Sequence, residues 1–131
     1  MIVNTELITF DAGIVLENGK KLDSFDLMVE SYGELNETKT NAILVCHAFS
    51  GNHHASGKNE LKEIGWWNEI IGPNKAIDTN KYYVVCCNNL GGCSGSSGPK
   101  SIDPSTKKPY GSNFPLVTVS DWVNSQKMLM D

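Results

Sequence analysis

Hydrophobic and polar positions alternate in two stretches near the start of the chain, weakly over residues 5–10 and clearly over residues 25–32. Alternation with a period of two is typical of a strand with one buried face and one wetter face. In the second stretch the buried face would carry Phe25, Leu27, Val29 and Ser31. The wetter face would carry Asp26, Met28, Glu30 and Tyr32. We therefore expect two strands before residue 33.

Two later stretches, residues 42–46 and 81–87, are continuously apolar rather than alternating. Continuous apolarity indicates a strand covered on both faces, as in a parallel sheet between helices. The intervening residues include 65–71 and are long enough for a crossover with a short helix, which two parallel strands require. The order strand, crossover, strand predicts an α/β fold with a mostly parallel central sheet flanked by helices.

The final third of the chain begins with a long irregular stretch, residues 88–115, rich in Gly, Ser, Pro and Lys. A loop of this length is usually functional or disordered, and a packed active-site loop is the interpretation we favour. A helix is expected from Thr118, where Asp121 three residues later resembles a capping box. Its apolar face would carry Val119, Trp122, Val123 and Met130. The absence of a helix stop signal before Asp131 suggests a truncated domain.

Composition narrows the class of protein. The 131 residues are 40 % hydrophobic and 20 % charged, which suits one globular domain. A net charge of −4, with eleven scattered Lys and no Arg, argues against a nucleic-acid surface. No apolar run approaches the ~18 residues of a membrane span, and the N-terminus lacks the features of a signal peptide. We therefore expect a cytoplasmic protein without a membrane segment.

Cysteines and histidines are the obvious candidates for metal binding. Adjacent Cys86 and Cys87 would point to opposite faces of a strand, so their spacing is wrong for a chelate. We expect buried, reduced thiols at the four cysteines Cys46, Cys86, Cys87 and Cys93. The histidines at 47, 53 and 54 match no chelating pattern and are expected to be structural.

Three further stretches invite a functional interpretation. Residues 46–51 follow a buried strand, where an α/β-hydrolase places a loop that supplies an oxyanion-hole N–H, although an ordinary turn is the alternative. Residues 91–101 fail the spacing of a phosphate-binding loop. They nearly form G-x-S-x-G around Ser94, and they leave a Cys93–His54 pair as a rival nucleophile and base. For Trp66-Trp67 we expect one core anchor and one partly exposed neighbour rather than a binding platform.

Taken together, these stretches resemble the homoserine O-acetyltransferase family, from about residue 16 to residue 131 and in the family's order. The matching stretches include NAILVCHAFSGNHHA at 41–55 and NLGGCSGSSGP at 89–99. The others lie at residues 32–36, 65–67, 71–79 and 108–111. Two departures are visible: the family usually has Leu at the position of Phe49 and Asp at the position of Asn52.

The resemblance implies that residues 1–131 form the N-terminal part of a single α/β-hydrolase domain, truncated before the nucleophile elbow. It implies acyl transfer from acetyl-CoA, a substrate rather than a resident cofactor, to the hydroxyl of L-homoserine in methionine biosynthesis. A Ser-His-Asp triad would perform the transfer, and by resemblance all three residues lie beyond Asp131. The backbone N–H of Phe49 would be one oxyanion-hole donor. Family members are commonly homodimers.

Three alternatives stay open at this point. One is a homoserine succinyltransferase, and another is a serine-directed acyltransferase or hydrolase on the same fold. The third is a short, non-catalytic chain.

Overall fold

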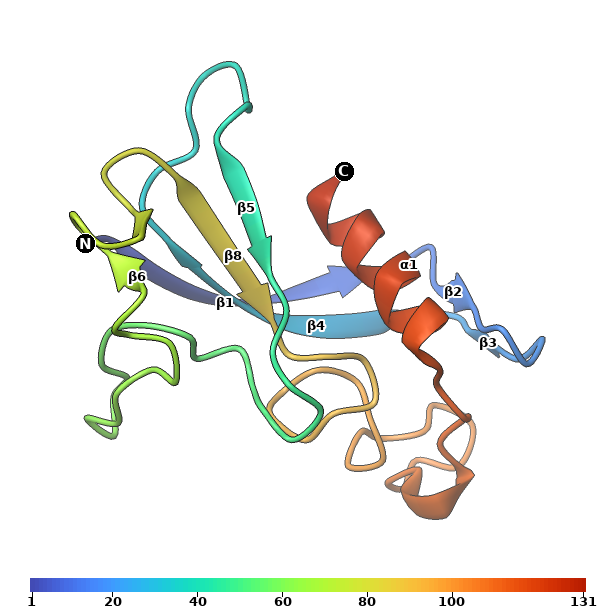
Figure 1. Cartoon of the computed structure of the whole chain (residues 1–131). Helices are drawn as coiled ribbons and strands as arrows, with labels where there is room; N and C mark the ends of the chain where they lie inside the picture. Colours follow the sequence, from blue (N-terminus) through green and yellow to red (C-terminus); the bar gives the residue numbers. More distant parts are fainter. The chain divides into compact units, whose positions relative to one another are not determined.

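The computed structural model describes all residues, 1–131 (Figure 1). The chain divides into two compact units. Unit 1 contains Met1–Glu6 and Val29–Cys87, and unit 2 contains Leu7–Met28 and Asn88–Asp131. Strands β1 (Val3–Phe10) and β4 (Phe25–Tyr32) contribute one end to each unit. Each unit is therefore described by itself.

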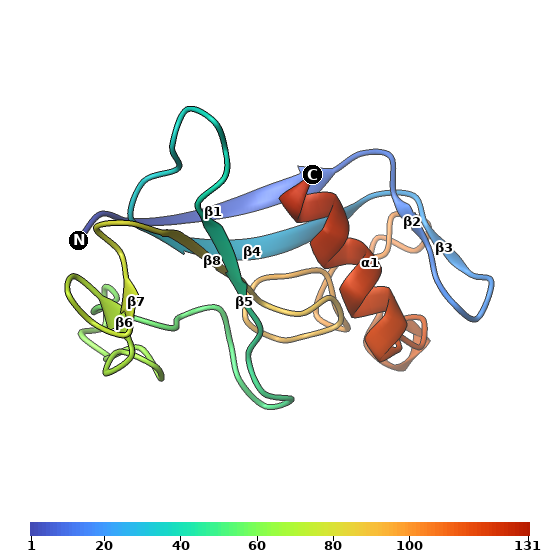
Figure 2. The same ribbon diagram turned by 45° about the horizontal axis from the view of Figure 1, so that its top comes forward.

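The central strand of unit 1 is β8 (Tyr83–Cys87), in a sheet with the order β1-β4-β8-β5. It runs antiparallel to β4, with Val29 opposite Cys87. It runs parallel to β5 (Ala42–Val45), and the two strands lie side by side in Figure 2. The α/β class and the parallel pairing of the two apolar stretches are thus confirmed, although this part of the sheet is mixed. The carboxyl ends of β5 and β8 lie at the same edge.

The core of unit 1 explains why β8 is apolar throughout. Val84 and Cys86 on one face of the strand are fully buried, and Val85 and Cys87 on the other face are also buried, so both faces are covered. Burying a side chain of this size contributes about 1.5–3 kcal/mol. The cluster comprises Tyr32, Val45, Ala55, Ile71, Val84 and Cys86.

Strand β4 has the predicted bounds, and its predicted wetter face is half-buried at Asp26 and Met28 but buried at Glu30 and Tyr32. Glu30 is only 3 % exposed and Tyr32 is fully buried. The Tyr32 hydroxyl donates a hydrogen bond to the Glu30 carboxylate, so each polar group has a partner inside the protein. Paired polar groups can be buried, which is why alternation misjudged this face.

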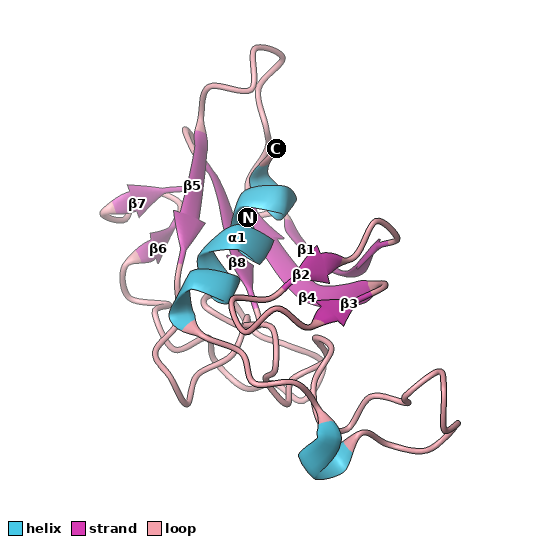
Figure 3. Cartoon of the chain, turned by 90° about the vertical axis from the view of Figure 1, so that its right-hand side faces the viewer, coloured by secondary structure: helices cyan, strands magenta, loops and turns pink.

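The expected helix between β5 and β8 is absent. Figure 3 shows loops there, with only the short parallel strands β6 (Ile71–Gly72) and β7 (Ile77–Asp78). Backbone N–H groups of this segment bond to the chain upstream: Gly65 N donates to Gly57 O at 2.9 Å, and Trp67 N to Ala55 O at 2.8 Å. A Cβ at Gly65 would lie 2.2 Å from the Ser56 nitrogen, so only glycine permits this approach.

Unit 2 begins with a hairpin of β2 (Ile14–Val15) and β3 (Lys21–Leu22), whose turn contains Gly19 at φ +84°. The Asn18-Gly19 pair in this turn is a sequence typical of turns. Residues 88–115 are irregular, as expected, with one short 3₁₀ helix, η1 (Gly111–Asn113). Backbone hydrogen bonds such as Gly91 N to Ser97 O at 2.7 Å order this stretch, so it is a packed loop.

Helix α1 (Val119–Met130) begins with the predicted capping box of Thr118 and Asp121. The expected burial of its apolar face is wrong, however, because Val119 is 67 % and Val123 59 % exposed. The buried side chains are instead Asp121, Ser125 and Gln126. None of the helices has the length and apolar character that crossing a membrane requires.

Hydrogen bonds explain the inverted burial of α1. Asp121 Oδ1 accepts from the Glu17 backbone N at 2.8 Å, and Oδ2 accepts from the Thr118 N at 2.9 Å. Gln126 Nε2 donates to Asn89 Oδ1 at 2.9 Å. The polar face of the helix thus ties it to its own unit, and the apolar stripe stays exposed.

Replacing Asp121 with Ala tests this anchoring. The variant leaves two backbone N–H groups without their acceptor, so the free energy of unfolding should fall by about 2–3 kcal/mol. Asn124→Ala, on the exposed side of the same helix, should change it by less than about 0.5 kcal/mol. Urea denaturation followed by circular dichroism measures both. Equal effects of the two substitutions would contradict the anchoring role.

Candidate functional site

The segment that follows β5, residues 46–57, is called the β5 loop. It leaves the edge of the sheet that contains the carboxyl ends of β5 and β8. Gly51 N donates to Ala48 O at 2.8 Å, which closes a tight turn. Phe49 lies in this turn with its side chain 86 % exposed. The backbone of the predicted oxyanion donor is therefore held in a turn directly after the parallel strand.

Asn52 fixes the second half of the β5 loop. Its Oδ1 accepts from the backbone N of His54 at 2.9 Å, and its carbonyl accepts from the Trp66 indole Nε1 at 3.0 Å. The rings of Trp66 and Trp67 stack with centroids 5.6 Å apart, and both residues are 42 % exposed. The expectation of one core tryptophan is therefore wrong, and Trp66 acts as a donor to the loop.

The three histidines of this loop have different surroundings. His47 Nδ1 lies 2.7 Å from Ala48 O. Both ring nitrogens of His54 have partners, with Nδ1 2.8 Å from Glu30 Oε2 and Nε2 3.1 Å from Glu63 O. His53 Nδ1 is buried without a hydrogen-bond partner, and burial lowers the pKa of this histidine.

Glu30 and Tyr32 are the residues that sequence reasoning missed. The Tyr32 hydroxyl accepts hydrogen bonds from the backbone N of Ala55 at 2.8 Å and of Ser56 at 3.0 Å. Burial raises the pKa of Tyr32, and the hydrogen bond to Glu30 raises it further. The available signal was an acid and a tyrosine two positions apart on one strand face, followed by a loop with adjacent histidines.

In unit 2, residues 88–98 follow β8 and form a second ordered loop. Asn88 Oδ1 accepts from Ser94 N at 3.1 Å. Ser96 Oγ donates to Asn88 O and accepts from Met28 N at 2.9 Å. These bonds give Asn88 and Ser96 structural roles. Nothing in this loop forms a base for Ser94.

All four cysteines are free thiols, as predicted, but only two are buried. Burial raises the pKa of Cys86 to about 12, so its thiol is inert at neutral pH. Cys46 and Cys93 are exposed, which corrects the expectation of buried thiols. A Cys93–His54 pair is disfavoured, because both ring nitrogens of His54 already have partners.

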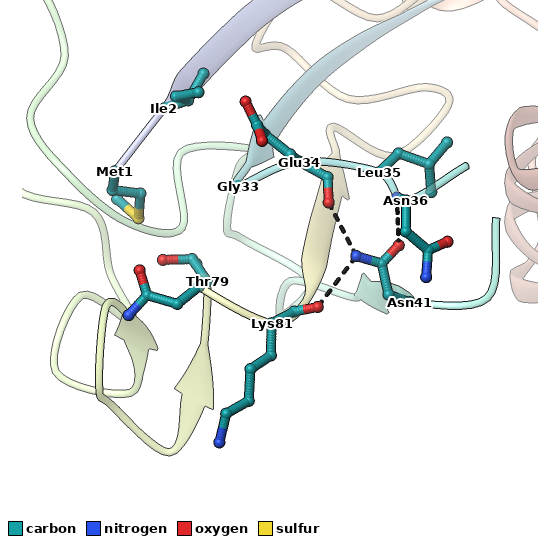
Figure 4. A pocket seen from close by; sticks show the side chains of 10 residues that line it. Met1, Ile2, Gly33, Glu34, Leu35, Asn36, Asn41, Thr79 and Lys81 are labelled. Atoms are coloured by element: carbon teal, nitrogen blue, oxygen red, sulfur yellow. Dashed lines mark hydrogen bonds between the residues drawn. The ribbon is translucent and has the colours of Figure 1, made fainter. Parts of the chain in front are cut away.

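A surface pocket of about 550 Å³ lies at the opposite, amino ends of β5 and β8 (Figure 4). Asn41 organises it: Nδ2 donates to Glu34 O at 2.9 Å and to Lys81 O at 3.1 Å, and Oδ1 accepts from Asn36 N at 2.9 Å. Ligands of open α/β sheets bind outside the carboxyl ends of the strands. We therefore place the candidate site at the β5 loop and not in this pocket.

The depressed pKa of His53 predicts a dependence of stability on pH. Its ordinary pKa is about 6.5, so between that value and the lower folded value the unfolded chain binds more protons. The contribution of His53 to stability is complete above about pH 6.5 and is lost as the pH falls. His53→Phe should therefore lose less unfolding free energy than the wild type between about pH 7 and pH 5, as measured by urea denaturation. Equal losses would contradict the assignment.

Comparisons with known proteins show which proteins this chain resembles. The chain is 58 % identical over 132 residues to homoserine O-succinyltransferase from Neisseria gonorrhoeae, covering 99 % of this chain and 35 % of that protein. Homoserine O-acetyltransferase from Bacillus anthracis superposes with a TM-score of 0.90 at 38 % identity, covering 99 % of this chain and 36 % of that one. For esterase E22 the TM-score is 0.89 at 39 % identity, covering 98 % and 37 %.

No protein-family model matches the chain. The chain spans about a third of the length of the relatives it matches. Within that span the chain is similar to homoserine O-acyltransferases in sequence and in structure, and it carries part of their α/β-hydrolase fold.

Proposed function

We propose that residues 1–131 are the N-terminal part of a homoserine O-acyltransferase that acts in methionine biosynthesis. The observation that carries this proposal is the 58 % identity to a homoserine O-succinyltransferase along nearly the whole chain. The exposed apolar residues Val119 and Val123 on α1 support it, since the rest of the protein would cover them. By "full-length protein" we mean the proposed complete protein, which contains this segment and the rest of the same domain.

The reaction is acyl transfer through a covalent intermediate. A serine on a nucleophile elbow attacks the thioester carbonyl of acyl-CoA, and its proton passes through the catalytic histidine to the departing CoA thiolate. The γ-hydroxyl of L-homoserine then attacks the acyl-enzyme, the bond between the serine oxygen and the acyl carbon breaks, and the hydroxyl proton of homoserine passes through the histidine to the serine oxygen. The elbow should follow the strand after α1, because it requires a strand-turn-helix context. Acyl-CoA is a substrate, and the chemistry needs no resident cofactor.

Within this segment, Phe49 supplies one oxyanion-hole donor through its backbone N–H. Two features support this role: its position in the first turn after β5, and the hydrogen bond between Gly51 and Ala48 that closes this turn. A donor of this kind must be held in place before the charge develops. The side chain points to solvent, being 86 % exposed, so the backbone carries the role.

The identity of the acyl group is the finer question. The resemblance at the level of sequence motifs suggested acetyl-CoA. The more similar relative, at 58 % identity, is a succinyltransferase, whereas the acetyltransferase of known structure is 38 % identical. We therefore propose succinyl-CoA as the first donor to test. Other parts of the proposal are a cytoplasmic location and a homodimer.

An ester hydrolase is the second candidate, favoured by the similarity to esterase E22. A hydrolase would transfer the acyl group to water and would not need homoserine. The two functions therefore differ in the dependence of CoA release on the acceptor.

The purified full-length protein should release CoA thiol only when both acyl-CoA and L-homoserine are present. Succinyl-CoA should support a higher kcat/KM than acetyl-CoA, and L-serine should replace homoserine poorly. Residues 1–131 alone should release none, because the triad lies outside them. Thiol release that does not depend on homoserine would favour the hydrolase, and no release with any donor would contradict the proposal.

Two substitutions at Phe49 separate its backbone from its side chain. Phe49→Leu keeps the N–H and should retain most of the activity of the full-length protein. Phe49→Pro removes the N–H and should lower kcat on the order of 100-fold. The comparison requires that both variants stay folded by circular dichroism. Similar kcat values for folded Leu and Pro variants would remove Phe49 from the oxyanion hole.

A further inference from the structure

A buried hydrogen-bond network in unit 1 has no part in the reaction steps above. Glu30 is at its centre: Oε2 lies 2.8 Å from His54 Nδ1 and accepts the hydroxyl hydrogen of Tyr32, and Oε1 accepts from Thr5 Oγ1 at 3.0 Å. Glu30 is 3 % exposed, His54 8 %, and Tyr32 not at all. Burying an acid is costly unless it is fully paired. Here both carboxylate oxygens have donors.

The geometry fixes how many protons the Glu30–His54 pair holds. His54 Nε2 faces the carbonyl of Glu63 at 3.1 Å, and a carbonyl can only accept. His54 Nδ1 faces a carboxylate oxygen, which is also an acceptor. Both hydrogen bonds form only if one extra proton is present, either on the imidazole or on the carboxyl group. The pair therefore shares one proton beyond those of a carboxylate and a neutral imidazole.

The hydrogen bond between Tyr32 and Glu30 orients the Tyr32 hydroxyl toward the β5 loop. Tyr32 donates to Glu30, so both its lone pairs point toward the N–H groups of Ala55 and Ser56. Both of these residues are fully buried, and no water can replace the hydroxyl as acceptor without entering the core. The network thus fixes one end of the loop against β4.

The fixed end is connected to the turn that contains Phe49. His54 N donates to Asn52 Oδ1 at 2.9 Å, which holds the residue next to Gly51. Gly51 N in turn donates to Ala48 O. The other end of the loop leaves β5, whose backbone is paired with β8. The Phe49 turn is therefore held from both sides.

We propose that Glu30, Tyr32 and His54 are positioning residues that share one proton and hold the β5 loop in the geometry needed for oxyanion stabilisation. This inference rests on the proposed function. Other titratable groups beside the network are His53 and His47 of the same loop and Cys86 of β8.

The test uses four variants of the full-length protein. Tyr32→Phe should lower kcat about 10- to 100-fold, because small displacements of a catalytic group are costly, while KM for acyl-CoA changes less than twofold. The matched control is Tyr82→Phe, at an exposed tyrosine outside the network, which should keep the wild-type kcat. Glu30→Gln retains an acceptor for the Tyr32 hydroxyl, so its kcat should be higher than that of Glu30→Ala.

A second readout does not depend on catalysis. Amide hydrogen exchange at Ala55 and Ser56 should be at least tenfold faster in Tyr32→Phe than in the wild type, and unchanged in Tyr82→Phe. If the wild type has no acyltransferase activity but exchange responds as expected, the proposed function fails while the network's hold on the loop stands. If Tyr32→Phe does not fold, the comparison of Glu30→Gln with Glu30→Ala provides the test instead. Unchanged exchange, or folded Glu30→Ala with wild-type kcat, overturns the proposal.

Discussion

The Tyr32 hydroxyl is the contact on which the arrangement of unit 1 depends most. It accepts two backbone N–H groups from the β5 loop and donates to Glu30, so one oxygen atom joins a sheet strand to the loop that follows a neighbouring strand. The same tyrosine lies in the hydrophobic cluster beneath the sheet. Packing therefore holds the Tyr32 ring in place, and the hydroxyl of that ring holds the β5 loop through its hydrogen bonds.

This arrangement joins stability and function through one set of atoms. Removing one partner of a buried hydrogen-bonded pair leaves the other group unsatisfied and costs about 1–3 kcal/mol, so Glu30 and His54 hold each other in place. The surrounding groups stay neutral: burial lowers the pKa of His53 and raises that of Cys86. A loop anchored in this way can present a backbone N–H without a flexible side chain. That is the property an oxyanion donor requires, because it must not reorganise during the reaction.

Local patterns predicted the elements that local chemistry controls. Strand β4, the apolar strands β5 and β8, and the Thr118 cap follow from alternation, continuous apolarity and capping. The helix expected near Gly65 does not form, because backbone hydrogen bonds to Gly57 and Ala55 compete with helix formation there. The buried face of α1 was inverted by the hydrogen bonds of Asp121, which reach a residue far away in sequence. The role of Glu30 could not be predicted for the same reason, because its partner His54 lies in a loop that is distant in sequence.

The most direct measurement is a crystal structure of the full-length protein with its nucleophilic serine phosphonylated, because the phosphonyl oxygen occupies the position of the oxyanion. If Phe49 is an oxyanion donor, its nitrogen should lie about 2.7–3.1 Å from that oxygen. The Tyr32 hydroxyl should still accept from the N–H groups of Ala55 and Ser56. A phosphonyl oxygen bound by other donors, with the Phe49 N–H directed elsewhere, would show that the β5 loop does not form the oxyanion hole.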